Sequence, residues 1–306
     1  MDIATLQSAI QVFLIFLATN ILMTFLVAHT RRNNLIKRKK IEEVFASQIS
    51  SFLYPGPDEN SHFLNVQRAL RAVGIREEKP EMVQYLIYLM INTQRALGGL
   101  NHTKLQKLYV QIPPYRASIT KVRKKDWFQK ARGIREIYEM DQRQYFNEIA
   151  AYRDHENVYV RREAQIALVS FLGWESLRFL PYLSRKISLW QQIKIVEKLH
   201  DLSKTPKVEY LRLGYPTQNP DAIELIIRII KKYMLISEVD FVLKNMLHAQ
   251  YEVRKAAIYC LFSFGVNNNE IDDKLVEIQY SIPSKIQQRQ ILTYLEKRRF
   301  REKPLL

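Results

Sequence analysis

The chain has 306 residues, and 47% of them are hydrophobic, which is enough for a sizeable buried core. It holds only 8 glycines and 11 prolines, too few turn residues for a barrel or sandwich of many short strands, so long helices are favoured. The single cysteine excludes an internal disulfide framework. The net charge of +16 predicts an anionic partner: lipid headgroups, nucleic acid or an acidic protein surface.

Residues 9–28 form an uncharged stretch of 20 residues, twelve of which are Leu, Ile, Phe or Val. At about 1.5 Å per residue, a helix of this length spans about 30 Å, the thickness of the hydrocarbon core of a bilayer. We therefore expect residues 9–28 to form a transmembrane helix and residues 1–8 to form a short extracytoplasmic N-terminus.

A cleaved signal peptide is the competing interpretation of this stretch. Signal peptides carry positive charge before a shorter apolar region and end in small residues at a cleavage site. In this chain Asp2 is the only charged residue before the apolar stretch, the basic residues follow it, and no A-x-A pattern marks its end. These flanks favour an uncleaved anchor.

The basic residues after the apolar stretch predict its orientation, because Lys and Arg near the end of a transmembrane helix stay on the cytoplasmic side. The chain is expected to cross the inner (cytoplasmic) membrane once, with its N-terminus outside and its C-terminal domain in the cytoplasm. The same side chains can bind anionic lipid headgroups, at about 1 kcal/mol each near the surface. They are Arg31, Arg32, Lys37, Arg38, Lys39 and Lys40.

Residues 29–53 are predicted to continue as a basic juxtamembrane helix. The sequence YPGPD at 54–58 ends it, because two prolines and a glycine cannot occupy the interior of a helix. Residues 54–115 are predicted to be a helical segment of no assigned family, in which Gly74 closes one helix and Pro80 opens the next.

An internal repeat is present in the second half of the chain. Residues 160–171 have the sequence VRREAQIALVSF, and residues 253–264, 93 positions later, have VRKAAIYCLFSF. Helical amphipathicity constrains the class of residue at a position and not its identity, so identical residues at a fixed offset indicate a repeated structural unit. The identical pairs are Val160 and Val253, Arg161 and Arg254, Ala164 and Ala257, Leu168 and Leu261, Ser170 and Ser263, and Phe171 and Phe264.

Three units of about 31 residues would fill this offset, and predicted helices recur near that spacing. The first helices of the units are expected to begin near Asp126, Val158, Ser188, Asp221, Glu252 and Ser284. Second helices are expected at Gln144–Tyr152, Glu175–Leu183, Glu238–Leu247 and Ile271–Tyr280. Residues 203–220 contain three prolines and are predicted to be a loop or insertion that replaces one second helix.

The pattern V-R-x-x-A-x-x-x-L, at the start of a first helix, resembles HEAT repeats of the short bacterial type. The resemblance covers roughly residues 124–299 and is strongest in the two units quoted above. It implies that residues 116–306 form a right-handed α-solenoid of HEAT-like helical hairpins, so the expected fold is all-α. It also implies that Arg161 and Arg254 are structural and pack between successive repeats.

The sequence contains no motif typical of catalysis, cofactor binding or metal binding. It lacks G-x-x-x-x-G-K-[ST], G-x-G-x-x-G, G-x-S-x-G and H-E-x-x-H, so we expect no catalytic residue, no cofactor and no metal. Cys260 aligns with Ala167 and is predicted to be a buried, inert thiol. The three tryptophans fall at or near the starts of repeat helices and are predicted to pack between helices.

The sequence thus predicts a membrane-anchored, non-enzymatic scaffold or adaptor that binds a protein partner at the cytoplasmic face of the membrane. The HEAT resemblance suggests an envelope or polysaccharide-export component, with a membrane glycosyltransferase or secretion component as its partner. Two alternatives stay open: an enzyme similar to the HEAT-type phycobilin lyases, and a nucleic-acid-binding protein similar to the HEAT-like DNA glycosylases. The membrane tether makes nucleic acid the least favoured partner.

Overall fold

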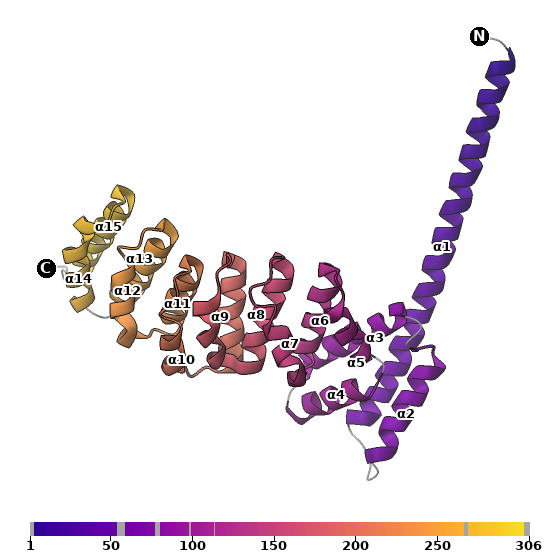
Figure 1. The fold of residues 1–306 in the computed structure, drawn as a ribbon, viewed down its shortest axis with the longest axis horizontal. Helices are drawn as coiled ribbons and strands as arrows, with labels where there is room; N and C mark the ends of the chain where they lie inside the picture. Colours follow the sequence, from indigo (N-terminus) through magenta and orange to yellow (C-terminus); the bar gives the residue numbers. More distant parts are fainter. Residues whose placement is uncertain are drawn as a thin grey trace. The chain divides into compact units, whose positions relative to one another are not determined.

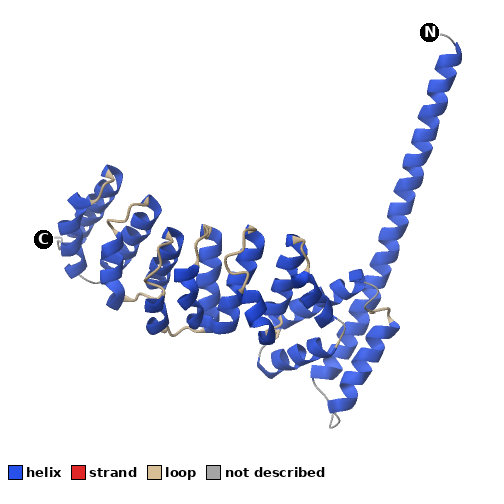
Figure 2. Cartoon of the chain, viewed as in Figure 1, coloured by secondary structure: helices blue, strands red, loops and turns tan. Residues whose placement is uncertain are grey.

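A computed structural model describes residues 3–53, 59–76, 80–97, 99–112, 114–265 and 269–302. All regular secondary structure in these residues is helical, and they contain no strand (Figure 1, Figure 2). The predicted all-α class is therefore confirmed, while the predicted break at 54–58 lies outside the described residues. The chain consists of two compact units, Met1–Lys121 and Val122–Leu306, which we call unit 1 and unit 2.

Unit 1 begins with a long helix, α1 (Ile3–Leu53), of 51 residues (Figure 1). Its N-terminal part is long and apolar enough to cross a membrane, and its side chains are exposed from Ile10 onward. The Thr19 and Asn20 side chains donate to the backbone carbonyl of Phe16, both at 2.8 Å. Because these polar groups bond within the helix, the cost of placing them in hydrocarbon is reduced.

The C-terminal part of α1 belongs to the core of unit 1. Ile41 and Phe45 are buried, with exposed fractions of 0% and 6%. The helix is unbroken between Ala28 and Ile41, so at about 1.5 Å per residue it holds this core about 20 Å beyond the end of the apolar stretch. The helices that contact α1 are α2 (Glu59–Ala72), α3 (Pro80–Ala96) and α4 (Gly99–Gln111).

Glycine and proline set two helix ends of unit 1 as predicted. Gly74 has a φ of +89°, a left-handed conformation that closes α2. The Ile75 amide then donates to the Leu70 carbonyl at 3.0 Å, which satisfies one of the last carbonyls of the helix. Pro80 is the first residue of α3, where its missing amide hydrogen costs nothing.

After α5 (Pro114–Arg123), unit 2 is a row of long helices, and all but the last are followed by short helical elements (Figure 1). The long helices are α6 (Trp127–Glu139), α8 (Val158–Leu172), α9 (Leu189–Leu202), α11 (Pro220–Lys232), α13 (Tyr251–Gly265) and α15 (Lys285–Glu302). Each begins within one residue of its predicted position. The short elements are η1 (Arg143–Tyr145), α7 (Phe146–Ala150), η2 (Gly173–Tyr182), α10 (Val208–Leu213), η3 (Ile236–Glu238), α12 (Val239–Asn245), α14 (Asn269–Ile278) and η4 (Gln279–Ser281).

Neighbouring helices in the row share one core. α8 contacts α6 and α9, and α11 contacts α9 and α13. The short elements add to the same core, since α7 and η2 contact α8 while α12 and α14 contact α13. A single cluster of buried apolar residues runs from Val169 on α8 to Leu295 on α15, so the stability of each long helix in this range depends on its neighbours.

Polar residues before the long helices fix where they start. Asp126 caps α6, Asn157 caps α8, Ser188 caps α9 and Asn219 caps α11. In each case a side-chain oxygen accepts a backbone amide hydrogen of the first turn, which has no partner within the helix. Such a cap contributes about 1 kcal/mol to helix stability.

The prediction is wrong for the segment that follows α9. Residues 203–220 are predicted to be a loop or insertion in place of a second helix, but they contain the short helix α10 (Val208–Leu213), which contacts η2. The helix forms because Leu211 is fully buried and because all three prolines of the segment lie outside it. The Arg212 guanidinium also bonds both carboxylate oxygens of Glu238, at 2.6 and 3.1 Å.

Glu238 holds α10 against the next pair of helices. Besides Arg212, its carboxylate accepts from the Tyr215 hydroxyl at 2.6 Å and from the Ser237 hydroxyl at 3.1 Å. These bonds, that from Arg212 foremost, lower the pKa of Glu238. Burial and the bond to Glu238 raise the pKa of Tyr215.

Arg161, the first arginine of the repeat, is 6% exposed and bonds only backbone carbonyls through its terminal nitrogens. Its Nη1 donates to His155 and Glu156 at 2.7 and 3.1 Å. Its Nη2 donates to Lys186 at 3.3 Å, just before the next long helix. Arg161 thus connects the turn before its own helix to the start of the next repeat.

Arg254, the second arginine, is 7% exposed and makes corresponding bonds. Its Nη1 donates to the carbonyls of His248 and Ala249, both at 2.7 Å. Its Nε donates to the amide oxygen of Gln287, on the next long helix, at 2.9 Å. The two arginines therefore occupy equivalent places in their units.

Two histidines extend this equivalence beyond the residues aligned by sequence. His155 and His248 are also 93 positions apart. The Nδ1 atom of each accepts the backbone amide two residues later, from Asn157 and Gln250, at 3.0 Å. Six further positions of the repeat are all buried: Val160, Ala164, Leu168, Val253, Ala257 and Leu261.

Removing Arg254 is expected to destabilise unit 2. Arg254→Ala leaves partly buried carbonyls without donors, which should lower the free energy of unfolding by roughly 2–3 kcal/mol. Arg254→Lys should not restore it, because lysine lacks the planar fork of donors. Denaturant titration followed by circular dichroism measures the change. The control, Arg289→Ala on an exposed side chain of α15, should stay within about 0.5 kcal/mol of the unmodified chain, and a similarly small value for Arg254→Ala would contradict the structural role.

Glu238 should make stability fall at low pH. Its pKa is lower in the folded chain than in the unfolded chain, so its contribution is complete above the unfolded value of about 4.3 and is lost as the pH falls through the folded value. Glu238→Gln should therefore destabilise the chain more at about pH 7 than at about pH 3. Denaturant titrations at both pH values test this, with Glu209→Gln on the exposed side of α10 as control. An equal effect of Glu238→Gln at both pH values would rule the linkage out.

Candidate functional site: the α11 groove

A groove runs along α11 between the flanking helices α9 and α13. It consists of two cavities of about 620 and 630 Å³, which share Arg228 and Lys231. The first cavity lies toward the N-terminal ends of these helices and the second toward their C-terminal ends. We call the two cavities together the α11 groove.

The floor of the groove is recessed because most of α11 belongs to the core. Eight of its 13 residues are buried, including Leu225, Ile226, Ile229 and Ile230, each with an exposed fraction of 0%. Full burial of such a side chain contributes about 1.5–3 kcal/mol. Because α9 and α13 both pack against α11, they stand on either side of it and form the walls.

Apolar side chains line both cavities. In the first cavity Ile187 and Ile227 are almost fully buried, whereas Leu189 and Tyr259 on the walls are 52% and 43% exposed. The apolar side chains of the second cavity are Ile193, Val196 and Met234. A further cavity of about 470 Å³ lies between α13 and α15, and Tyr259 lines it as well. The groove therefore offers exposed apolar surface to another molecule.

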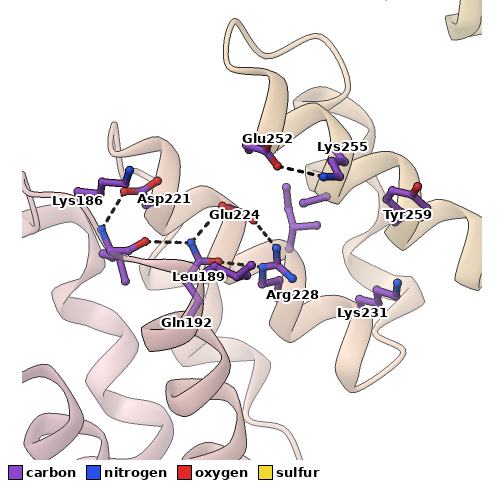
Figure 3. A pocket seen from close by; sticks show the side chains of 13 residues that line it. Lys186, Leu189, Gln192, Asp221, Glu224, Arg228, Lys231, Glu252, Lys255 and Tyr259 are labelled. Atoms are coloured by element: carbon purple, nitrogen blue, oxygen red, sulfur yellow. Dashed lines mark hydrogen bonds and ion pairs between the residues drawn. The ribbon is translucent and has the colours of Figure 1, made fainter. Parts of the chain in front are cut away.

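The buried polar groups of the first cavity are bonded to one another (Figure 3). The Gln192 Nε2 atom donates to Glu224 at 3.1 Å, and the Arg228 Nε atom donates to the Gln192 Oε1 atom at 2.9 Å. Arg228 also pairs with Glu224, which closes the triangle. The Asp221 carboxylate accepts the Ile187 amide at 2.8 Å. These bonds hold α9 against α11 and leave neither carboxylate positioned as an unpaired acid or base.

The lysines of the first cavity carry its available positive charge. Lys255 pairs with Glu252 at 3.5 Å. Lys231 lies over the Tyr259 ring, 5.8 Å from its centroid, and like Lys186 it has no carboxylate within salt-bridge distance in the described part of the chain. Two ammonium groups beside an apolar floor can attract a segment that combines apolar and acidic side chains.

The six basic residues predicted to flank the membrane lie on α1, after its apolar stretch. They are exposed, and at 100° per residue they are distributed around the circumference of the helix. The Arg38 guanidinium lies over the Tyr85 ring, 5.1 Å from its centroid, and the Tyr85 hydroxyl donates to Glu42. This hydrogen bond, with burial, raises the pKa of Tyr85 to about 12. Arg38 therefore also contributes to the packing of unit 1.

The predicted burial of Cys260 is confirmed, since its exposed fraction is 0%. Burial raises the pKa of its thiol to about 12, so very little thiolate forms at neutral pH. No group of three or more His, Cys, Asp or Glu side chains that could hold a metal ion occurs among the described residues.

The tryptophan prediction is confirmed for Trp174, whereas Trp127 and Trp190 contact the neighbouring helix α8 but are not buried. Trp174 is 2% exposed and packs against Tyr233 with ring centroids 4.9 Å apart. Trp127 and Trp190 are 43% and 51% exposed. Both lie in the first turn of a long helix, where part of each ring contacts α8 and the rest is exposed, and sequence position alone does not distinguish this placement from full burial.

No protein family model matches the chain, and no curated protein matches it in sequence. The resemblance to HEAT repeats therefore stays a prediction.

Proposed function

We propose that the chain is a membrane-anchored, non-enzymatic adaptor whose α11 groove binds a segment of a protein partner. The apolar stretch of α1 anchors it in the cytoplasmic membrane, and the rest of unit 1 after this stretch lies in the cytoplasm together with unit 2. The observation that carries this proposal is the groove itself: exposed apolar walls, a floor of core residues, and buried polar groups that are already bonded to each other.

The size of the groove supports a peptide segment as the occupant. α11 has 13 residues and is about 20 Å long, which is enough for about three and a half turns of a partner helix or about six extended residues. Lys186 and Lys231 favour a segment with acidic side chains. The HEAT resemblance suggests a membrane glycosyltransferase or secretion component as the protein that carries it.

A HEAT-like solenoid is our proposal for the fold of unit 2. The identical residues 93 positions apart, the matching bonds of Arg161 and Arg254, and the shared core of successive long helices support it. Such a fold provides an extended surface for a partner without an enclosed active site, which agrees with an adaptor function.

The charge pattern of α1 supports the proposed orientation. Six basic residues surround the helix within about 14 Å of Arg31, and positively charged flanks stay on the cytoplasmic side. The unbroken helix would hold the core of unit 1 about 20 Å from the hydrocarbon, beyond the headgroup region. Anionic headgroups are the proposed ligands of this basic segment.

Cysteine labelling tests the orientation, since the native Cys260 is buried. Lys204→Cys introduces a thiol at an exposed residue of unit 2. A membrane-impermeant maleimide should not label it in intact spheroplasts and should label it after lysis, while Ser8→Cys should be labelled in intact spheroplasts and after lysis alike. The chain without added cysteine is the background control. Labelling of Lys204→Cys in intact spheroplasts would exclude a cytoplasmic unit 2.

Photocrosslinking in native membranes tests partner binding in the groove. A photoreactive phenylalanine analogue at Tyr259, on the groove wall, should form an adduct of one discrete mass with another protein. The same analogue at Tyr182, which is 67% exposed on η2 and outside the groove, is the matched control. Deleting residues 1–28 should lower the adduct yield at Tyr259 about tenfold or more, because the partner is then no longer held at high local concentration. Equal adducts at both positions, or none at Tyr259 and at Leu189, would contradict the proposal.

A further inference from the structure

Three successive long helices expose large apolar side chains in their first turn. Each of α6, α8 and α9 begins with two such residues, and all six side chains are between 43% and 52% exposed. They are Trp127, Phe128, Val158, Tyr159, Leu189 and Trp190. We call the four aromatic residues among them, Trp127, Phe128, Tyr159 and Trp190, the aromatic strip.

The aromatic strip is continuous from helix to helix. The Trp127 and Tyr159 rings stack with their centroids 5.0 Å apart and their planes inclined by 22°. The Arg162 guanidinium lies 5.4 Å from the centroid of the Tyr159 ring and 4.9 Å from that of the Trp190 ring, and so joins them. Phe128 meets Trp127 edge to face at 5.9 Å. Side chains of three helices thus form one ordered row of half-exposed rings.

Positive charge accompanies the strip. Lys124 and Lys125 directly precede the cap of α6, and Lys186 closely precedes α9; all three are exposed and have no carboxylate partner in the described part of the chain. The N-terminal ends of α6, α8 and α9, which carry the positive poles of their helix dipoles, lie at the same side chains. Arg162 pairs with Glu163 at 3.0 Å, so its charge is partly compensated.

Half-exposed aromatic rings beside exposed lysines are typical of protein surfaces at the interface between a bilayer and water. Trp and Tyr prefer the headgroup level, where an apolar ring and a polar edge are both satisfied, and Lys and Arg bind anionic headgroups there. A chain tethered by α1 keeps unit 2 beside a membrane at all times, so contact needs little added affinity. An anionic lipid surface is the partner that agrees with all three observations: the aromatic rings, the positive charge and the tether through α1.

We propose that the aromatic strip is a second membrane contact, which lies in the headgroup region of an anionic bilayer. The proposal rests on the membrane anchoring proposed above. With two attachments, α1 and the strip, unit 2 would lie on the membrane in one orientation, and the α11 groove, whose wall includes Leu189, would face partners at the headgroup level.

The chain carries a suitable set of probes, because two of its three tryptophans belong to the strip and the third is buried. Full-length variants with one tryptophan each are made by changing the other two to phenylalanine. They are reconstituted into phosphatidylcholine vesicles with brominated acyl chains, with and without phosphatidylglycerol. Fluorescence of the variants that keep Trp127 or Trp190 should fall about twofold relative to unbrominated vesicles, and only when phosphatidylglycerol is present.

The matched control keeps Trp174 and should not be quenched by brominated lipid. Replacing Lys124 and Lys125 with glutamate should weaken quenching of Trp127 without changing the circular dichroism spectrum. Equal quenching of all three tryptophans, or full access of Trp127 and Trp190 to aqueous acrylamide in anionic vesicles, would overturn the proposal, since the rings would then face water or a protein partner. Flotation distinguishes failure of the membrane anchor from failure of the second contact. A chain that does not float with vesicles contradicts the anchor, whereas a chain that floats with unquenched strip tryptophans contradicts the second contact alone.

Discussion

A pair of helices in unit 2 cannot bury its own apolar face, and the rest of the unit depends on this constraint. The shared core from Val169 to Leu295 shows the consequence, because each long helix contributes side chains to the packing of the next. Where a helix is covered on both sides, as α11 is by α9 and α13, its residues are mostly buried and its surface lies below that of its neighbours. The α11 groove follows from this packing.

Apolar packing alone does not fix the spacing between successive repeats of unit 2. The two buried arginines fix it more closely. A guanidinium group has five donors in a fixed plane, so Arg254 can bond two carbonyls of one turn and a side chain of the next helix at once. Arg161 does the same with backbone carbonyls only. Directional bonds of this kind fix the geometry of a contact that hydrophobic burial favours but does not orient.

Identity at a fixed offset was the most informative feature of the sequence, because it located the arginines, the buried apolar positions and the starts of six long helices. Extending the same comparison five residues upstream would also have found His155 and His248. The helix α10 was missed because prolines counted against it, although they lie outside its six residues. The groove and the exposure of Trp127 and Trp190 depend on which side of a helix its neighbours cover, and periodicity within one helix does not contain that information.

The first turn of α9 links the two proposed surfaces. Leu189 belongs to the wall of the α11 groove, while its neighbour Trp190 belongs to the aromatic strip, about 100° away around the same helix. Gln191 and Gln192 follow them and are both 1% exposed, so this turn is fixed to the core by buried side chains. On the two proposals above, this turn presents Leu189 to a protein partner and Trp190 to lipid, so a movement of the turn at one surface also changes the other. Membrane contact and partner binding should therefore be coupled through α9. The coupling is positive if one position of unit 2 completes both surfaces, and negative if each surface requires a different position.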